Sequence, residues 1–149
     1  MKTDSAAPIL SHGDNAELDR ELIQVCRDIA AITWELKALN TVVVDLRGRV
    51  SYTDFVIVTT GTSDRQVNAL ARSIDDAMRE AGRPPMGTEG TEHGRWALLD
   101  YGDVIVHVFH QDARKDYDLE RMWSEAPRLE LEDAPSELYG RFDAQRFET

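Results

Sequence analysis

The sequence has one cysteine, few basic residues for its length and no long hydrophobic run. A single cysteine excludes an internal disulfide bond and therefore a small secreted scaffold held together by disulfides. No stretch approaches the roughly 20 apolar residues that a membrane span needs, and Met1 to Leu10 lacks the apolar core of a signal peptide. We therefore expect a protein of the reducing cytoplasm without a membrane partner.

Positive charge is scarce: 17 Lys and Arg stand against 28 Asp and Glu, which gives a formal net charge of −11. This balance argues against direct, sequence-specific binding to nucleic acid, because contacts with phosphates need clustered Lys and Arg. Two interpretations stay open. The acidic surface either serves solubility alone or contacts a basic protein.

The chain has 149 residues, of which 42% are hydrophobic, so it is one domain's worth and can bury a core. Residues 1–13 are small and polar and are predicted to be a disordered extension. Residues 14–126 carry the periodic apolar patterns of a folded domain. Residues 127–149 form an acidic C-terminal tail that we predict to be disordered or only loosely docked.

A first helix is predicted to begin near Asp14, with Glu17 completing a capping box. Its apolar residues recur every three or four positions and form one stripe for the core, composed of Leu18, Leu22, Val25, Ile29, Ile32 and Leu36. Cys26 falls beside this stripe, which predicts a reduced, half-buried structural thiol.

Two β-branched runs, 41–46 and 55–60, predict strands. A second helix follows, with Ser63 as its N-cap and Gln66 completing another capping box. Residues 86–94 are predicted to form a loop. Beyond the next two strands we expect a short helix that carries Tyr117, Leu119, Met122 and Trp123.

The most informative stretch runs from Trp96 to Phe109 and reads as two apolar strands joined by a turn. Because successive strand side chains point to opposite faces, Trp96, Leu98 and Asp100 share one face, and Ala97, Leu99 and Tyr101 share the other. Both faces are largely apolar, as is typical of strands covered on two sides. In so short a chain the helices need not cover all of that surface.

An aromatic side chain beside a carboxylate at the hairpin tip therefore suggests a docking patch for another protein. The residues that we predict to bind this partner are Trp96, Leu98, Asp100, Tyr101 and Asp103. The alternative is that Trp96 only closes the core.

A rival interpretation is an enzyme of nucleotidyl transfer, because Gly61-Thr62-Ser63 at the start of a helix resembles a turn that cradles phosphate. Such chemistry needs carboxylates that hold Mg²⁺ against the phosphates. The nearest Asp-x-Asp pair, Asp116 and Asp118, lies about fifty residues later. We therefore expect no catalytic residues and no cofactor, with Gly61 and Ser63 acting as turn and cap.

A metal site is not expected either. His107 and His110 are three residues apart on one strand and point to opposite faces, so they cannot chelate one ion. His107 is most simply a packed strand residue that is hydrogen-bonded within the sheet.

Five motifs, in order, resemble the ribosomal silencing factor family, also called Iojap-like. They are Gly48-x-x-Ser51-x-Thr53-Asp54, Thr60-Gly61-Thr62-Ser63-x-Arg65, Gly87-x-Glu89-Gly90, Trp96-x-Leu98-x-Asp100-x-Gly102-Asp103-x-x-x-His107-x-Phe109, and Tyr117-x-Leu119-Glu120-x-x-Trp123. The resemblance covers about Leu18 to Trp123, so the first thirteen and last two dozen residues fall outside it.

The resemblance implies a compact α/β domain, with a mixed sheet and helices packed on it, in a nucleotidyltransferase-like topology without the catalytic carboxylates. It implies binding to the large ribosomal subunit through its fourteenth protein, which blocks joining with the small subunit and represses translation. It also implies a homodimer when the protein is free of the ribosome. Thr53, Asp54, Arg65 and His107 are expected to support the binding edge, the first three by fixing the strand-to-helix corner.

Overall fold

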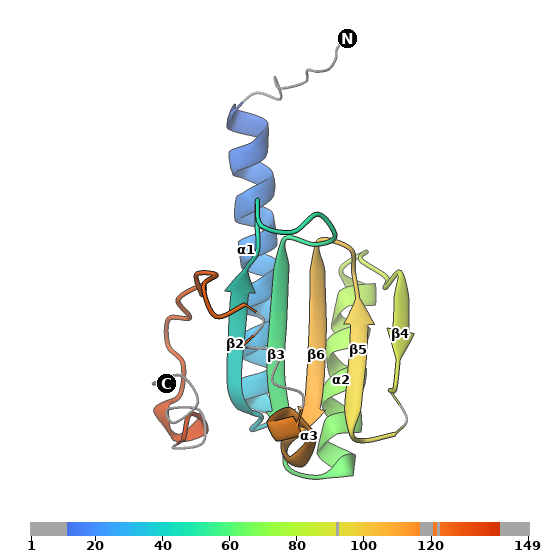
Figure 1. Cartoon of the computed structure of the whole chain (residues 1–149). Helices are drawn as coiled ribbons and strands as arrows, with labels where there is room; N and C mark the ends of the chain where they lie inside the picture. The colour runs from blue at the N-terminus through green and yellow to red at the C-terminus, as the bar shows by residue number, and fades with distance from the viewer. Residues whose placement is uncertain (1–11, 92, 117–120, 122, 141–149) are drawn as a thin grey trace.

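A five-stranded mixed sheet forms the centre of the computed structural model, which describes residues 12–91, 93–116, 121 and 123–140 (Figure 1). In spatial order the strands are β2 (Leu39–Asp45), β3 (Phe55–Gly61), β6 (Val104–His110), β5 (Trp96–Asp100) and β4 (Gly87–Glu89). β3 and β6 run parallel, and each other neighbouring pair is antiparallel. The predicted α/β fold with a mixed sheet is confirmed.

The prediction of a plain loop at 86–94 is wrong, because β4 lies within it and pairs with β5. All three β4 residues are exposed, and such a short polar strand has no apolar alternation from which it could be predicted.

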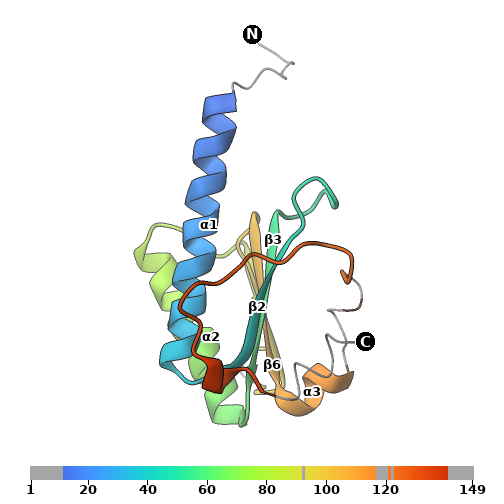
Figure 2. The same ribbon diagram turned by 90° about the vertical axis from the view of Figure 1, so that its left-hand side faces the viewer.

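Two long helices, α1 (His12–Glu35) and α2 (Asp64–Glu80), cover one face of the sheet (Figure 2). Between them and the sheet lies the first core cluster. Its largest buried members are Ile29, Phe55, Ile57, Leu70, Ile74 and Leu99. Cys26 is fully buried here, more deeply than predicted. The burial raises the pKa of its thiol to about 12, so it stays protonated and serves packing.

The first turns of α1 extend beyond the end of the sheet (Figures 1 and 2). Leu18, predicted to face the core, is 56% exposed because no strand or second helix reaches it, and that prediction is wrong. The helix also begins at His12, two residues before the predicted cap Asp14. Among the described residues, no helix combines the length and the apolar content that crossing a lipid bilayer requires.

The start of α2 is capped as predicted. Ser63 Oγ accepts the backbone N–H of Gln66 at 3.1 Å. The Gln66 side-chain oxygen in turn accepts the N–H of Thr62 at 2.6 Å, one residue before the position that a capping box uses. These bonds satisfy donors that a helix terminus otherwise leaves to water.

On the opposite face, the short helix α3 (Gln111–Asp116) and residues 123–126 cover only part of the sheet. They complete a second core cluster of Val42, Val44, Leu46, Val56, Val58, Phe109 and Ala113, against which Trp123 and Ala126 pack. Trp123 lies in a turn rather than in the predicted short helix. The other residues predicted for that helix, Tyr117, Leu119 and Met122, lie outside the described residues.

Residues 127–140, which we call the strap, dock along the outer edge of β2. The N–H of Asp45 donates to the carbonyl of Pro127 at 2.8 Å, and the N–H of Leu129 donates to the carbonyl of Val43 at 2.9 Å. The strap then crosses to the helix side, where Leu129 and Leu131 pack against the first cluster (Figure 2). For this segment the structure shows a docked chain where the sequence predicted a loose tail. The residues after 140, like the predicted N-terminal extension up to residue 11, lie outside the described residues.

Gly90 begins the connection between β4 and β5, and replacing it tests how closely this connection approaches β5. Its φ is +71°, and an added Cβ would overlap the carbonyl oxygen of Trp96. Gly82 also has a positive φ, +81°, but a Cβ there would meet nothing within 4 Å. We expect Gly82→Ala to cost about 1–2 kcal/mol of unfolding free energy from backbone strain alone. Gly90→Ala should cost at least about 2 kcal/mol more in urea denaturation, and equal losses would contradict the close approach.

Candidate docking face

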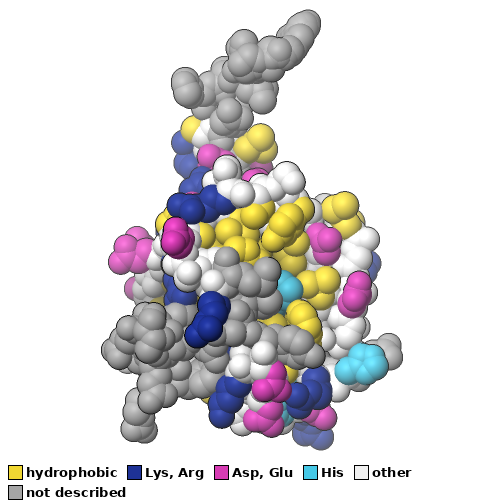
Figure 3. Space-filling view, in the orientation of Figure 1, with side chains coloured by type: hydrophobic (Ala, Val, Ile, Leu, Met, Phe, Trp, Pro, Cys, Tyr) yellow, Lys and Arg dark blue, Asp and Glu magenta, His cyan; other side chains and the backbone are white. Residues whose placement is uncertain are grey.

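The sheet face opposite α1 and α2, which we call the open face, is covered unevenly. Val44 of β2 and Val56 and Val58 of β3 are buried on this face, in the second core cluster that Ala113 of α3, Trp123 and Ala126 complete. Over β5 and β6, by contrast, side chains of the same face are partly exposed, namely Trp96, Leu98, Ile105 and His107. A space-filling view of this side shows a group of hydrophobic side chains at the surface (Figure 3). We call the four residues the open-face patch.

Trp96 occupies one end of the patch and is held by two contacts. Its ring stacks on Phe109 of the neighbouring strand, with centroids 5.0 Å apart. Its indole Nε1–H donates to Nδ1 of His107 at 3.0 Å. The ring packs against the second core cluster while one side stays partly exposed. Trp96 therefore helps to close the core and also contributes to the surface.

Leu98 lies at the centre of the patch, opposite His107 on β6 and opposite Glu89 on β4. The Glu89 side chain shares the open face with Leu98 and is exposed. Sequence reasoning missed this carboxylate because its face is set by the register of β4, a strand that was not predicted. The patch thus has an acidic neighbour on its β4 side.

The β5–β6 turn adds further carboxylates. Asp100 accepts the N–H of Gly102 at 2.8 Å, so its side chain shapes the turn, while Asp103 is exposed. The Asp103 carbonyl accepts the N–H groups of Asp54 and Phe55, both at 3.0 Å. Burial, followed by the nearby carboxylate of Asp103, raises the pKa of Asp54. Negative charge therefore gathers at this end of the open face.

Tyr101 does not belong to the open-face patch. It points to the helix side, packs against the first core cluster and donates its hydroxyl to Asp75 Oδ1 on α2 at 2.7 Å. The prediction that Tyr101 shares a docking patch with Trp96 and Leu98 is therefore wrong. Strand alternation already placed it on the other face, with Ala97 and Leu99.

The structure does not bring Thr53, Asp54 and Arg65 together at one strand-to-helix corner. Thr53, which is buried, and Asp54 precede β3 beside the β5–β6 turn. Arg65 is exposed in the first turn of α2, which follows the other end of β3. Seven strand residues, or roughly 20 Å, separate the two ends. The structure therefore brings Thr53 and Asp54 to the open-face end of the hairpin and leaves Arg65 elsewhere.

The residues of the rival phosphate site have packing roles in this structure. A Cβ on Gly61 would lie 2.9 Å from Val67 Cγ2, so the glycine lets α2 start close to β3. Ser63 Oγ and the Gln66 side chain already bond the first amides of the helix. In the described part of the chain, no three His, Cys, Asp or Glu side chains are placed to hold a metal ion.

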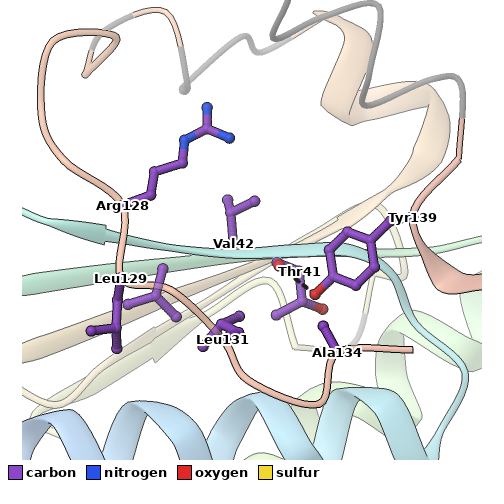
Figure 4. Close-up of a pocket in the computed structure, with 8 residues that line it drawn as sticks. Thr41, Val42, Arg128, Leu129, Leu131, Ala134 and Tyr139 are labelled. Atoms are coloured by element: carbon purple, nitrogen blue, oxygen red, sulfur yellow. Dashed lines mark hydrogen bonds between the residues drawn. The ribbon is translucent and has the colours of Figure 1, made fainter. Parts of the chain in front are cut away.

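A cavity of about 280 Å³ lies between β2 and the strap (Figure 4). Its walls come from Thr41, Val42, Val43, Arg128, Leu129, Leu131, Ala134 and Tyr139. The Tyr139 hydroxyl donates to the Thr41 carbonyl at 2.8 Å and closes one end. The cavity lies along the β2 edge, whereas the open-face patch lies over β5 and β6.

Several known proteins are similar to this chain in sequence and in fold. The model of a family described as "Ribosomal silencing factor during starvation" matches residues 19–148, so the family pattern includes the strap, which the resemblance had left outside. The ribosomal silencing factor RsfS of Halalkalibacterium halodurans is 39% identical over 114 residues, which are 76% of this chain and 95% of that protein. A more distant mouse protein, named mitochondrial assembly of ribosomal large subunit protein 1, is 24% identical over 99 residues, covering 64% of this chain and 43% of its own. A crystal structure from Chromobacterium violaceum has a TM-score of 0.64 at 33% identity and covers 77% of this chain and 92% of that one.

The burial of His107 generates a prediction about pH. Burial lowers the pKa of its imidazole from 6.5 to about 4. As the pH falls from 6.5 towards 4, the unfolded chain takes up a proton that the folded chain refuses, so the free energy of unfolding falls and then levels off below pH 4. The full effect is at most about 3 kcal/mol.

Urea denaturation at pH 7.5 and pH 4.5 measures this effect. The wild-type chain should lose about 2 kcal/mol more than His107→Phe, which has no group to titrate at this position. Leu18→Phe, at an exposed position without a titratable group, provides the control and should keep the wild-type dependence. Identical losses in the wild-type chain and His107→Phe would mean that His107 titrates normally.

Proposed function

Because the chain belongs to the ribosomal silencing factor family, we propose that it binds the large ribosomal subunit through its fourteenth protein and blocks joining with the small subunit. Translation is repressed as a result. The relatives are named as silencing factors, a regulatory role that fits a protein without catalysis. We place the protein in the cytoplasm, where ribosomal subunits meet.

The open-face patch is the observation that carries this proposal. It presents partly exposed apolar side chains, among them a tryptophan and a leucine, on the one sheet face that α1 and α2 leave uncovered. Aromatic and aliphatic anchors of this kind supply most of the binding energy of protein interfaces. The polar groups around the patch would then exclude water from it.

The charge around the patch indicates the kind of partner. Glu89 and Asp103 are exposed beside it, and the whole chain carries −11. Complementary charge speeds association and disfavours wrong partners. A basic protein, as proteins that contact ribosomal RNA are in general, fits this surface better than the RNA itself does.

Of the two ribosomal subunits, the large one is the better-supported target. The mouse relative is named for the assembly of the large subunit, which supports a contact on that side. A domain of 149 residues has a radius of gyration near ~15 Å, enough to obstruct a contact between subunits sterically. We also propose that the free chain forms a homodimer, because an apolar patch without its partner favours self-association.

Replacing Leu98 tests the docking face. Leu98→Lys places a positive charge at the centre of the patch, where the aliphatic part of lysine can still lie on the sheet. We expect the affinity for purified large subunits, measured by co-sedimentation, to fall at least about 30-fold, since an interface anchor contributes about 2 kcal/mol.

Leu18→Lys is the matched control, because Leu18 is exposed on the protruding part of α1. Its affinity should stay within about twofold of wild type. If both variants bind equally well, the interface lies elsewhere on the molecule.

Blocking of subunit joining is tested directly by adding the protein in excess to purified subunits. The yield of joined ribosomes in a sucrose gradient should fall, with no nucleotide required, because the mechanism is steric. Asp116→Asn, which would disable the rival enzyme, should block joining as well as wild type does. Normal joining at saturating protein, with Mg²⁺-dependent nucleotide turnover, would contradict the proposal.

A further inference from the structure

His107 lies in the middle of the open-face patch, and both of its ring nitrogens can be assigned. It occupies a row across three strands, between Val58 on β3 and Leu98 on β5. Its Nδ1 accepts the indole N–H of Trp96 at 3.0 Å. A nitrogen that accepts a hydrogen bond carries no proton, so the proton of the neutral imidazole is on Nε2.

The Nε2–H group has no acceptor within the described part of the chain. The Nε2 atom is not fully buried, so water can reach it in the free protein. The ring itself is fixed, because it lies almost parallel to Phe109 at 8° with centroids 5.9 Å apart. The Nε2–H group of His107 is therefore a hydrogen-bond donor that is held in one orientation at the surface and has no acceptor among the described residues.

The surroundings of this donor are apolar. Val58, Leu98 and Ile105 flank it on the open face, and the indole N–H of Trp96 is already used. When a partner covers the patch, water is removed from Nε2–H. That loss is costly unless the partner supplies an acceptor in its place.

We propose that His107 is a specificity-determining residue of the docking face, whose Nε2–H donates a hydrogen bond to a main-chain carbonyl oxygen of the docked protein. The inference rests on the proposed function and adds to it the chemistry of one contact. A neutral carbonyl suits the site better than a carboxylate, because Glu89 and Asp103 already place negative charge around the patch.

His107→Phe keeps a flat ring on Phe109 but removes the donor. We expect its affinity for purified large subunits to fall about tenfold, because a carbonyl of the partner is left unpaired in an apolar interface. His93→Phe, the same change at an exposed histidine outside the patch, should bind like wild type.

The Trp96→Phe background separates a direct contact from an effect through Trp96. In that background no indole N–H depends on His107, so adding His107→Phe should still weaken binding about tenfold. If the loss disappears there, His107 acts only by placing Trp96, and the inference is wrong. If His107→Phe binds with wild-type affinity while Leu98→Lys binds more weakly, the inference is wrong and the proposed function still stands. Failure of the wild-type chain to bind at all would remove both.

A measurement on the unmutated chain avoids any question of folding. In nuclear magnetic resonance of the isotope-labelled full chain, Nδ1 of His107 should appear unprotonated in the free protein. On addition of the fourteenth large-subunit protein, exchange of the Nε2–H proton with water should slow at least tenfold. Unchanged exchange in a saturated complex would show that the donor is not used.

Discussion

Both faces of the sheet are rich in apolar side chains, but α1 and α2 cover only one of them. The first cluster is closed by these helices and reaches nearly complete burial. Among the described residues, the second face is covered by α3 and the turn that contains Trp123. Ala113 of α3 and Trp123 pack into the second cluster, but Trp96, Leu98, Ile105 and His107 of β5 and β6 stay partly exposed. The partial exposure of the open-face patch therefore reflects how far the described elements extend over the sheet.

Buried hydrogen bonds fix the relative positions of helices and strands that hydrophobic packing alone defines less precisely. Arg114 of α3 is fully buried and donates to the carbonyl of Asn40 and to the Thr60 hydroxyl, at 2.7 and 2.6 Å. Near the same end of the sheet, the hydroxyls of Thr33, Thr41 and Thr59 form a chain from α1 through β2 to β3. Such bonds stabilise one arrangement because a misplaced helix would leave buried donors unsatisfied.

Local patterns in the sequence predicted a large part of this structure. Strand alternation separated Ala97 and Leu99 from Trp96 and Leu98, and the capping residues located the start of α2. The errors concern information that is not local. Periodicity cannot show that the sheet ends before it reaches Leu18, and the order of motifs cannot show that Thr53 and Arg65 lie at opposite ends of β3. Composition predicted a loose tail for the strap, because its pairing with β2 depends on backbone groups that every residue carries. Strand alternation also placed Trp96 and Leu98 on one face, whereas the position of Glu89 beside Leu98 depended on the register of β4.

The order in which the chain is synthesised gives the strap an additional consequence. β2 emerges early and pairs with β3 on one side, while the main-chain groups of Val43 and Asp45 on its outer edge bond to residues 127–129. At ribosomal rates these late residues follow roughly 5–15 s after β2. During that interval the nascent chain displays an open β-edge, the kind of surface through which partly made proteins aggregate. The C-terminal segment thus completes the fold late, and a chain released before residue 127 would keep its edge exposed.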